Sequence, residues 1–160
     1  MDRKTKFFVT LLVFLAGIAV IMYLGRLASQ STEIETWYAS LKKPALTPHE
    51  YIFPLVWWIV YFLMALSASM LFCKPKTSKR AIALTFWSLQ LLFNILWSLC
   101  FFTFRSPLIA AFDIAFLWIT VIIATITAFR VSRGAGWFMI PNALWVSFAV
   151  YLNIAIVVLN

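Results

Sequence analysis

Side chains that could hold a ligand recur at helical spacing in three apolar stretches. One stretch carries four of them at separations of four, three and four residues: Gln90, Asn94, Trp97 and Phe101. Residues so spaced lie on one face of a helix. Two further stretches repeat the pattern with aromatic, small and amide side chains, namely Trp57, Tyr61, Met64 and Ala68, and Asn142, Trp145, Ala149 and Leu152 with Asn153 beside them. Three such faces packed together predict an apolar pocket with a few hydrogen-bonding groups, which is typical of a small-molecule site.

The same amide side chains have a second interpretation. Asn and Gln inside apolar helices also hydrogen-bond to a neighbouring helix, and each such bond contributes about 0.6–2 kcal/mol. The amides would then hold helices together without binding a ligand. The residue types alone leave both interpretations open.

Acid–base and metal chemistry have few candidates in this sequence. There is one histidine, His49, and there are two cysteines. No Ser-His-Asp set, phosphate-binding loop, carboxylate pair or metal-ligand spacing is present. A reaction would therefore rely on the reactivity of the ligand, with tryptophan as the redox-capable side chain. No metal and no required cofactor is expected.

Asp113 is the one acidic residue well inside an apolar stretch. Ionisable groups at such positions often bind substrate or transfer protons. A proton relay needs a second member, which the sequence lacks, so we favour a structural role for Asp113. The partners expected for its carboxylate are a neighbouring helix end, Arg105, Lys42 and Lys43.

The composition places all these residues in a membrane protein. Of 160 residues, 64% are apolar and 11% are charged, against about 45–50% and 25% in soluble domains. A soluble fold of this size could not bury so much apolar surface. This excludes a soluble enzyme, a disordered chain and a secreted disulfide scaffold. The net charge of +8 comes from short basic clusters between apolar runs, so we expect headgroup contacts and no nucleic-acid partner.

Five apolar stretches are long enough to cross a bilayer, which takes about 20 residues. Backbone groups in lipid must pair within the segment, so each is expected to be a helix. The first is interpreted as a retained helix because it is too long for the apolar core of a signal peptide, the alternative considered. The predicted fold is an all-α bundle of five transmembrane helices, at residues 7–25, 53–73, 81–104, 108–129 and 137–159.

The basic residues also predict the orientation. Nine Lys and Arg residues lie on the side of the N-terminus and four on the opposite side. Because positive residues concentrate in the cytoplasm, the N-terminus is expected inside and the C-terminus outside. Cys73 and Cys100 then lie near opposite faces and cannot form a disulfide.

Residues 26–52 form an unusually long connection. Loops beyond about 12–15 residues are often functional, and this one is rich in aromatic residues and contains Pro44 and Pro48. We expect it to fold back as a lid over the outer end of the bundle; the alternative is a segment anchored in the headgroups.

An odd number of helices without an internal repeat argues against an inverted-repeat transporter.

Several segments together resemble the TspO/MBR family of tryptophan-rich sensory proteins. They occur in order from residue 37 onward: Trp37-Tyr38-x-x-Leu41-x-Lys43-Pro44, Phe53-Pro54-x-Val56-Trp57-x-x-x-Tyr61, Gln90-Leu91-x-x-Asn94-x-x-Trp97-Ser98-x-x-Phe101-Phe102, Asp113 before Leu117-Trp118, and Pro141-x-x-Leu144-Trp145-x-x-Phe148-Ala149-x-Tyr151-Leu152-Asn153. No single segment is specific, but the ordered set is.

The resemblance implies a homodimer of five-helix bundles with an internal pocket under the long loop. It also implies porphyrins and related lipophilic molecules as ligands. Some ligand-binding residues are expected because their positions match the family motifs, and others because they lie on the helix faces described above. Together they are Trp37, Tyr38, Trp57, Tyr61, Gln90, Asn94, Trp97, Phe101, Trp145 and Ala149. Trp57 and Trp145 match positions that the family links to light- and oxygen-dependent porphyrin breakdown, so they are the expected catalytic residues.

One departure from the family pattern favours a bacterial member. Animal relatives carry a basic residue after the position of Tyr151 in a cholesterol motif, and here no Lys or Arg follows it. The predicted function is a receptor or sensor for porphyrins in a bacterial cell membrane, with porphyrin breakdown as a further activity. The main alternative is a transporter of such molecules.

Overall fold

The computed structural model describes residues 2–29 and 31–160, with the backbone alone described at 3, 28 and 29. Regular structure in these residues is entirely helical. The elements in chain order are α1 (Arg3–Ser29), α2 (Thr32–Ser40), α3 (Ile52–Phe72), α4 (Ser78–Ser98), the π-helix η1 (Leu99–Thr103), α5 (Pro107–Val131) and α6 (Arg133–Leu159).

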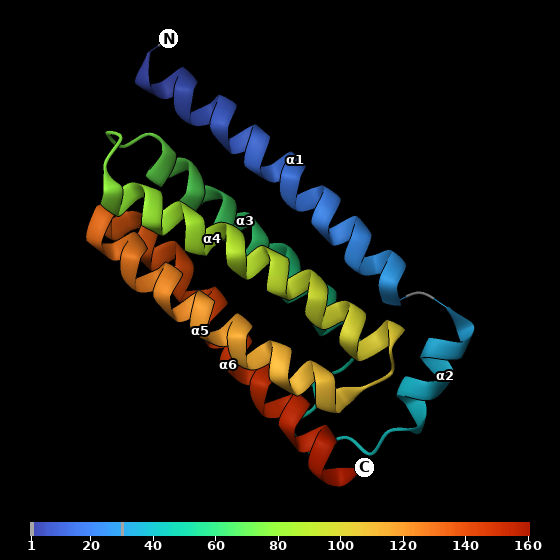
Figure 1. Cartoon of the computed structure of the whole chain (residues 1–160). Coiled ribbons are helices and arrows are strands. Elements are labelled where there is room, and N and C mark those ends of the chain that lie inside the picture. Colours follow the sequence, from blue (N-terminus) through green and yellow to red (C-terminus); the bar gives the residue numbers. More distant parts are fainter. Residues whose placement is uncertain (1, 30) are drawn as a thin grey trace.

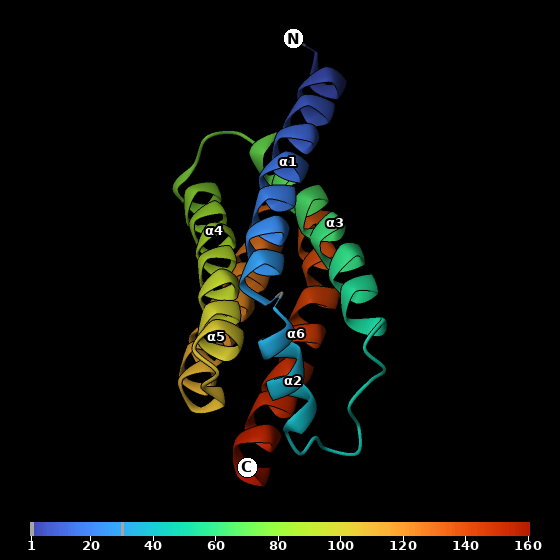
Figure 2. The ribbon, with the colours of Figure 1, turned by 90° about the vertical axis from the view of Figure 1, so that its right-hand side faces the viewer.

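Five of these helices form the predicted bundle, which is therefore confirmed. Each is long and apolar enough to cross a membrane. They are arranged as a ring in which α1 contacts α3 and α4, α3 contacts α6, and α5 contacts both α4 and α6 (Figures 1 and 2). The N-terminus lies at one end of the bundle, called here the N-terminal end, and the C-terminus at the opposite, C-terminal end (Figure 1).

The α5–α6 connection differs from the prediction, which left residues 130–136 outside the helices. Ser132 alone separates the two helices. Its backbone is extended (φ −156°, ψ 120°), and its N–H donates to the Ala128 carbonyl at 2.8 Å. The Gly136 N–H in turn donates to the Ser132 carbonyl at 3.0 Å. Backbone hydrogen bonds thus continue on both sides of one extended residue.

Two glycines near this joint permit close packing rather than a loop. A Cβ on Gly136 would lie 2.3 Å from Cγ of Phe129, and one on Gly134 would lie 2.7 Å from Cε of Met70. Real Cβ atoms do not approach so closely. Glycine here lets α6 start directly against α5 and α3.

The long first connection is also more ordered than predicted. Helix α1 continues to Ser29, and α2 occupies Thr32–Ser40, so only residues 41–51 link α2 to α3 without a helix. The Ser31 side chain caps α2 by accepting a hydrogen bond from the Ile34 N–H at 3.2 Å. Glu33 and Glu35 in its first turn complement the helix dipole.

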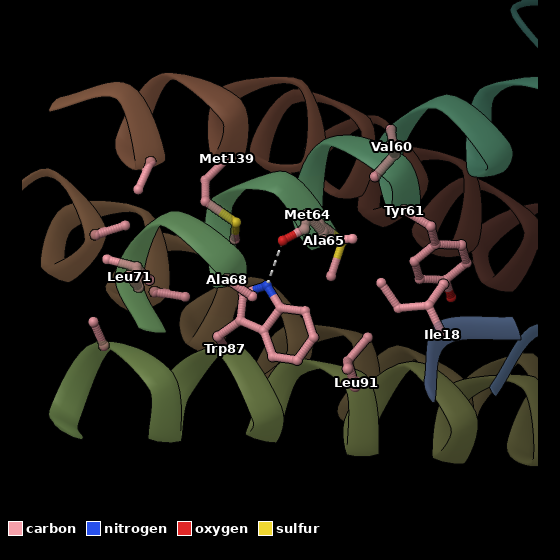
Figure 3. Packing of buried hydrophobic residues seen from close by; sticks show 14 residues of the cluster. Ile18, Val60, Tyr61, Met64, Ala65, Ala68, Leu71, Trp87, Leu91 and Met139 are labelled. Atoms are coloured by element: carbon pink, nitrogen blue, oxygen red, sulfur yellow. Dashed lines mark hydrogen bonds between the residues drawn. The ribbon is translucent and has the colours of Figure 1, made fainter. Parts of the chain in front are cut away.

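The largest buried cluster joins α3, α4, α5 and α6, with Ile18 contributed by α1. Small residues such as Ala65, Ala68 and Ala83 let the helices approach closely. The Trp87 indole nitrogen donates to the Met64 carbonyl at 3.1 Å, linking α4 to α3 (Figure 3). Ile18 is the one buried side chain among those described in α1, so this helix lies largely outside the core.

Candidate functional site

The three predicted faces meet inside the bundle. Trp57 and Tyr61 of α3, Gln90 and Asn94 of α4, and Asn142 of α6 border one interior position. Apolar side chains complete the lining: Met64, Leu91, Leu117, Val121 and Val146. We call the five polar and aromatic residues, together with Trp145, the interior group.

Hydrogen bonds within the interior group connect different helices. The Asn142 amide donates to the Gln90 Oε1 atom at 2.7 Å, between α6 and α4. The Tyr61 hydroxyl donates to the Asn94 Oδ1 atom at 2.5 Å, between α3 and α4. Both pairs therefore connect neighbouring helices, which is the hydrogen bonding that the second interpretation predicts; ligand binding by these residues stays a prediction.

Two buried donors of the interior group are left over after this pairing. Within the described part of the chain, Gln90 Nε2 and Trp145 Nε1 have no hydrogen-bond partner. A buried polar group without a partner costs about 1–3 kcal/mol. Both atoms are N–H donors, so a molecule bringing hydrogen-bond acceptors would satisfy them.

Aromatic rings surround these donors. Trp57 stacks on Tyr61 with ring centroids 5.1 Å apart, and it meets Trp145 edge-on at 6.3 Å. Phe53 also contacts Trp145, at 5.9 Å. The indoles expected to react are therefore adjacent, with one on α3 and the other on α6.

The expectation of an open pocket in this place is wrong. The space between the lining residues is too small to hold a water molecule. Apolar side chains pack it from several helices, and the amides pair with one another, as is usual in close-packed protein interiors. A guest can therefore enter only if α3, α4 and α6 move apart.

The remaining predicted residues lie elsewhere, at the C-terminal end. The Trp37 and Tyr38 rings of α2 contact Phe101 at 5.7 and 6.2 Å, and Trp97 stacks on the same ring at 5.1 Å. We call these four residues the end group. Ala149 and Trp97 also pack against the cluster that contains Val146, so Trp97 lies between the two groups.

The π-helix η1 shapes the end group, and sequence analysis missed it. Its N–H to C=O bonds span five residues, as from Phe104 to Leu99 at 2.9 Å. This wider turn brings both Phe101 and Phe102 against Tyr38. Single π-turns occur frequently at functional sites, but no residue type in Leu99–Thr103 marks one.

Polar contacts tie α2 and the following residues to the bundle. The Asn160 side chain accepts from the Lys42 N–H at 2.9 Å and donates to the Lys42 carbonyl at 3.0 Å. The Lys43 ammonium lies 4.1 Å from the centre of the Tyr38 ring. Burial and the nearby Glu50 carboxylate raise the pKa of Tyr38, so its hydroxyl stays neutral.

The expected pairing of Asp113 with Arg105 is wrong. Arg105 instead forms an ion pair with Glu33 of α2 at 2.7 Å. Its backbone has a φ of 50°, in the left-handed region that bulky residues avoid. The Asp113 Oδ2 atom is buried and has no partner among the described residues.

Residues 9–159 match a family that is described as the TspO/MBR family. The chain belongs to the TspO/MBR family. It is 36% identical to "Tryptophan-rich protein TspO" of Chlorobaculum tepidum over 78% of this chain and 79% of that one. It is 32% identical to the protein of the same name from Archaeoglobus fulgidus, over 94% of this chain and 98% of that one. The human "Translocator protein" is 27% identical over 73% of this chain and 70% of its own length.

Family membership and these names support a membrane sensor or receptor. A further relative, from Cereibacter sphaeroides, is named "Tryptophan-rich sensory protein"; it is 33% identical over 79% of this chain and 78% of its own length. In this TspO/MBR chain, sequence spacing found every member of the interior group. It missed Phe102, which contacts Tyr38 of the end group, and the hydrogen bonds between Asn160 and Lys42.

Proposed function

We propose that this TspO/MBR chain is a membrane receptor that binds porphyrins and related flat lipophilic molecules among the residues of the interior group. The main support is the pair of buried donors, Gln90 Nε2 and Trp145 Nε1, that lack a partner beside two adjacent indoles. This combination offers aromatic faces for stacking and two N–H groups for an acceptor.

The chemistry of a porphyrin suits these groups. Its ring is flat and apolar, so it can stack on indole and phenol faces. Its edge carboxylates need cations, and Lys42 and Lys43 follow α2 directly. The ring would then lie among the helices with its charged edge toward the C-terminal end.

Binding in this way requires an open form of the bundle. Because the interior is closed, the open form is a minor state that a ligand must favour by its own contacts. Entry breaks the Tyr61–Asn94 and Gln90–Asn142 pairs, and the ligand offsets this loss by burying its apolar faces and by pairing the free donors.

A titration with protoporphyrin followed by tryptophan fluorescence tests the proposal. Saturable quenching is expected for the native chain, and Trp145→Leu or Asn94→Leu should raise Kd by tenfold or more, equivalent to about 1.4 kcal/mol. Trp58→Leu is the matched control, because Trp58 is adjacent to Trp57 but 62% exposed. Unchanged Kd in both interior variants would refute the site, and absence of saturable quenching would refute the ligand.

We further propose that the chain lies in a bacterial cell membrane as a homodimer, with the C-terminal end outside. The nine basic residues at the N-terminal end of the bundle support this orientation, and the resemblance of the motifs supports the dimer. Cross-linking in native membranes tests the dimer. If only monomers are captured at every cross-linker length, the dimer is excluded.

Trypsin added to intact cells tests both the orientation and the covering role of α2. In Trp37→Ala, loss of the contact with Phe101 should expose the Lys42–Lys43 bond and speed its cleavage several-fold. Glu33→Gln is the control, since it removes only an exposed ion pair, and such pairs contribute little. Equal cleavage in the native chain and Trp37→Ala would contradict the proposal that α2 protects this bond. Cleavage only after lysis would contradict the proposal that the C-terminal end lies outside the cell.

A further inference from the structure

Basic residues are concentrated at the N-terminal end. Nine of the thirteen Lys and Arg residues belong to this end, against one acidic residue, Asp2. The start of α1, the α3–α4 connection and the α5–α6 joint all lie there (Figure 1). The described basic side chains are those of Lys4, Lys6, Lys74, Lys76, Lys79, Arg80, Arg130 and Arg133.

Among the described residues, no ion pair compensates the positive charge at the N-terminal end. Among the residues that the structure describes, the ion pair between Arg105 and Glu33 lies at the other end. The Asp2 carboxylate already accepts a hydrogen bond from the Thr5 N–H at 2.8 Å. Like charges held together repel one another and attract anions from the surroundings.

Two of the cations are held at one point, around the ring of Phe72. The Arg80 guanidinium lies 4.8 Å from the ring centre and the Lys6 ammonium 5.8 Å from it. Arg80 is more than nine-tenths buried, and its Nη1 atom donates to the Lys74 carbonyl at 2.9 Å. The ring thus positions one cation from α1 and one from α4 against α3, by cation–π contacts.

We propose that this junction binds the phosphate of an anionic phospholipid headgroup. Lys6 and Arg80 would hold the phosphate between them, with the remaining basic residues adding attraction. A lipid is favoured over a soluble phosphate because exposed apolar residues lie close to both cations along the chain: Phe8 of α1 is two residues from Lys6, and Ile82 of α4 is two residues from Arg80. Acyl chains would lie against that surface while the headgroup contacts the cations.

The test compares phosphatidylglycerol with phosphatidylcholine of identical acyl chains. Native mass spectrometry of the purified full chain in detergent gives Kd for the first lipid bound. Phosphatidylglycerol is expected to bind at least tenfold more tightly, and glycerol phosphate, which lacks chains, should not bind measurably. Equal binding of the two lipids would overturn the proposal, as would glycerol phosphate binding as tightly as the lipid.

Variants locate the site. Each basic residue near a membrane surface changes affinity about fivefold. Lys6→Gln with Arg80→Gln should therefore raise Kd for phosphatidylglycerol about 25-fold and leave Kd for phosphatidylcholine unchanged. Lys42→Gln with Lys43→Gln removes the same charge at the opposite end and should change affinity less than twofold. Equal weakening by both pairs would show diffuse attraction and refute a site at Phe72.

A charge-conserving variant keeps the test valid if Arg80→Gln does not fold. Phe72→Leu retains every cation but loses the ring that positions two of them. It should lower the preference for phosphatidylglycerol at least threefold. An unchanged preference would show that the ring does not organise the site. These outcomes are independent of porphyrin binding, which concerns the interior group.

Discussion

Under light and oxygen, the double variant Trp57→Phe with Trp145→Phe is expected to bind a porphyrin yet degrade it at least tenfold more slowly than the native chain. An indole can give up an electron to a photoexcited ring far more readily than a benzene ring can. Both indoles belong to the interior group and lie 6.3 Å apart between ring centres. The measurement is the loss of porphyrin absorbance at saturating protein, because phenylalanine keeps part of the stacking surface.

The control for this pair changes two tryptophans outside the interior group. Trp58→Phe with Trp118→Phe removes the same number of indoles from exposed positions on α3 and α5. It should leave the rate of breakdown unchanged. If the interior variant degraded the porphyrin at the native rate, Trp57 and Trp145 would not be catalytic residues, and the binding proposal would stand without an activity.

Gly136→Ala is expected to lower the midpoint of thermal unfolding by about 2–12 °C. The new methyl group would lie 2.3 Å from Cγ of Phe129 and within 2.5 Å of two further ring carbons. Phe129 cannot withdraw freely because its ring packs edge-on against Trp137 at 5.6 Å. Overpacking of this kind costs about 1–3 kcal/mol, and 1 kcal/mol shifts the midpoint by roughly 2–4 °C in a chain of this length.

Gly17→Ala is the matched control for this substitution. A Cβ on Gly17 would have no neighbour within 4 Å, and the residue lies inside α1. Alanine favours helices over glycine by about 1 kcal/mol, so Gly17→Ala should leave the midpoint unchanged or raise it. If both variants unfolded at the same temperature, the close approach at the α5–α6 joint would be wrong.

The five spans could be predicted because length and apolar character alone define them. The helix ends could not, since they depend on local contacts. Residues 130–136 are predicted as a connection because of their low apolar content, whereas Gly134 and Gly136 within them permit close packing against Met70 and Phe129. Helix α2 did leave a signal, the Ser31 cap followed by Glu33 and Glu35, but its nine residues lack the apolar length by which the other helices are predicted.

The interior group could be predicted because its members repeat at helical spacing within α3, α4 and α6. The end group depends on η1 and α2, and neither follows from periodicity. Phe101 has the spacing of the interior face, yet it packs with Trp37 and Tyr38 at the C-terminal end. Whether an interior is open or filled depends on the summed shapes of side chains from four helices, and residue types do not specify this.

Helix α6 joins regions of the molecule that are far apart. Its 27 residues span about 40 Å, and beyond Pro141 it runs without a break to Leu159. Three side chains along this stretch hydrogen-bond to other elements. Asn142 donates to Gln90, and Asn153 accepts from Trp97. Asn160, just past the helix end, accepts from the backbone N–H of Lys42. A shift or tilt of α6 beside Asn142 would therefore also displace Asn160 and the backbone of Lys42 at the C-terminal end. A partner bound at that end would then meet a changed surface without contacting the interior group.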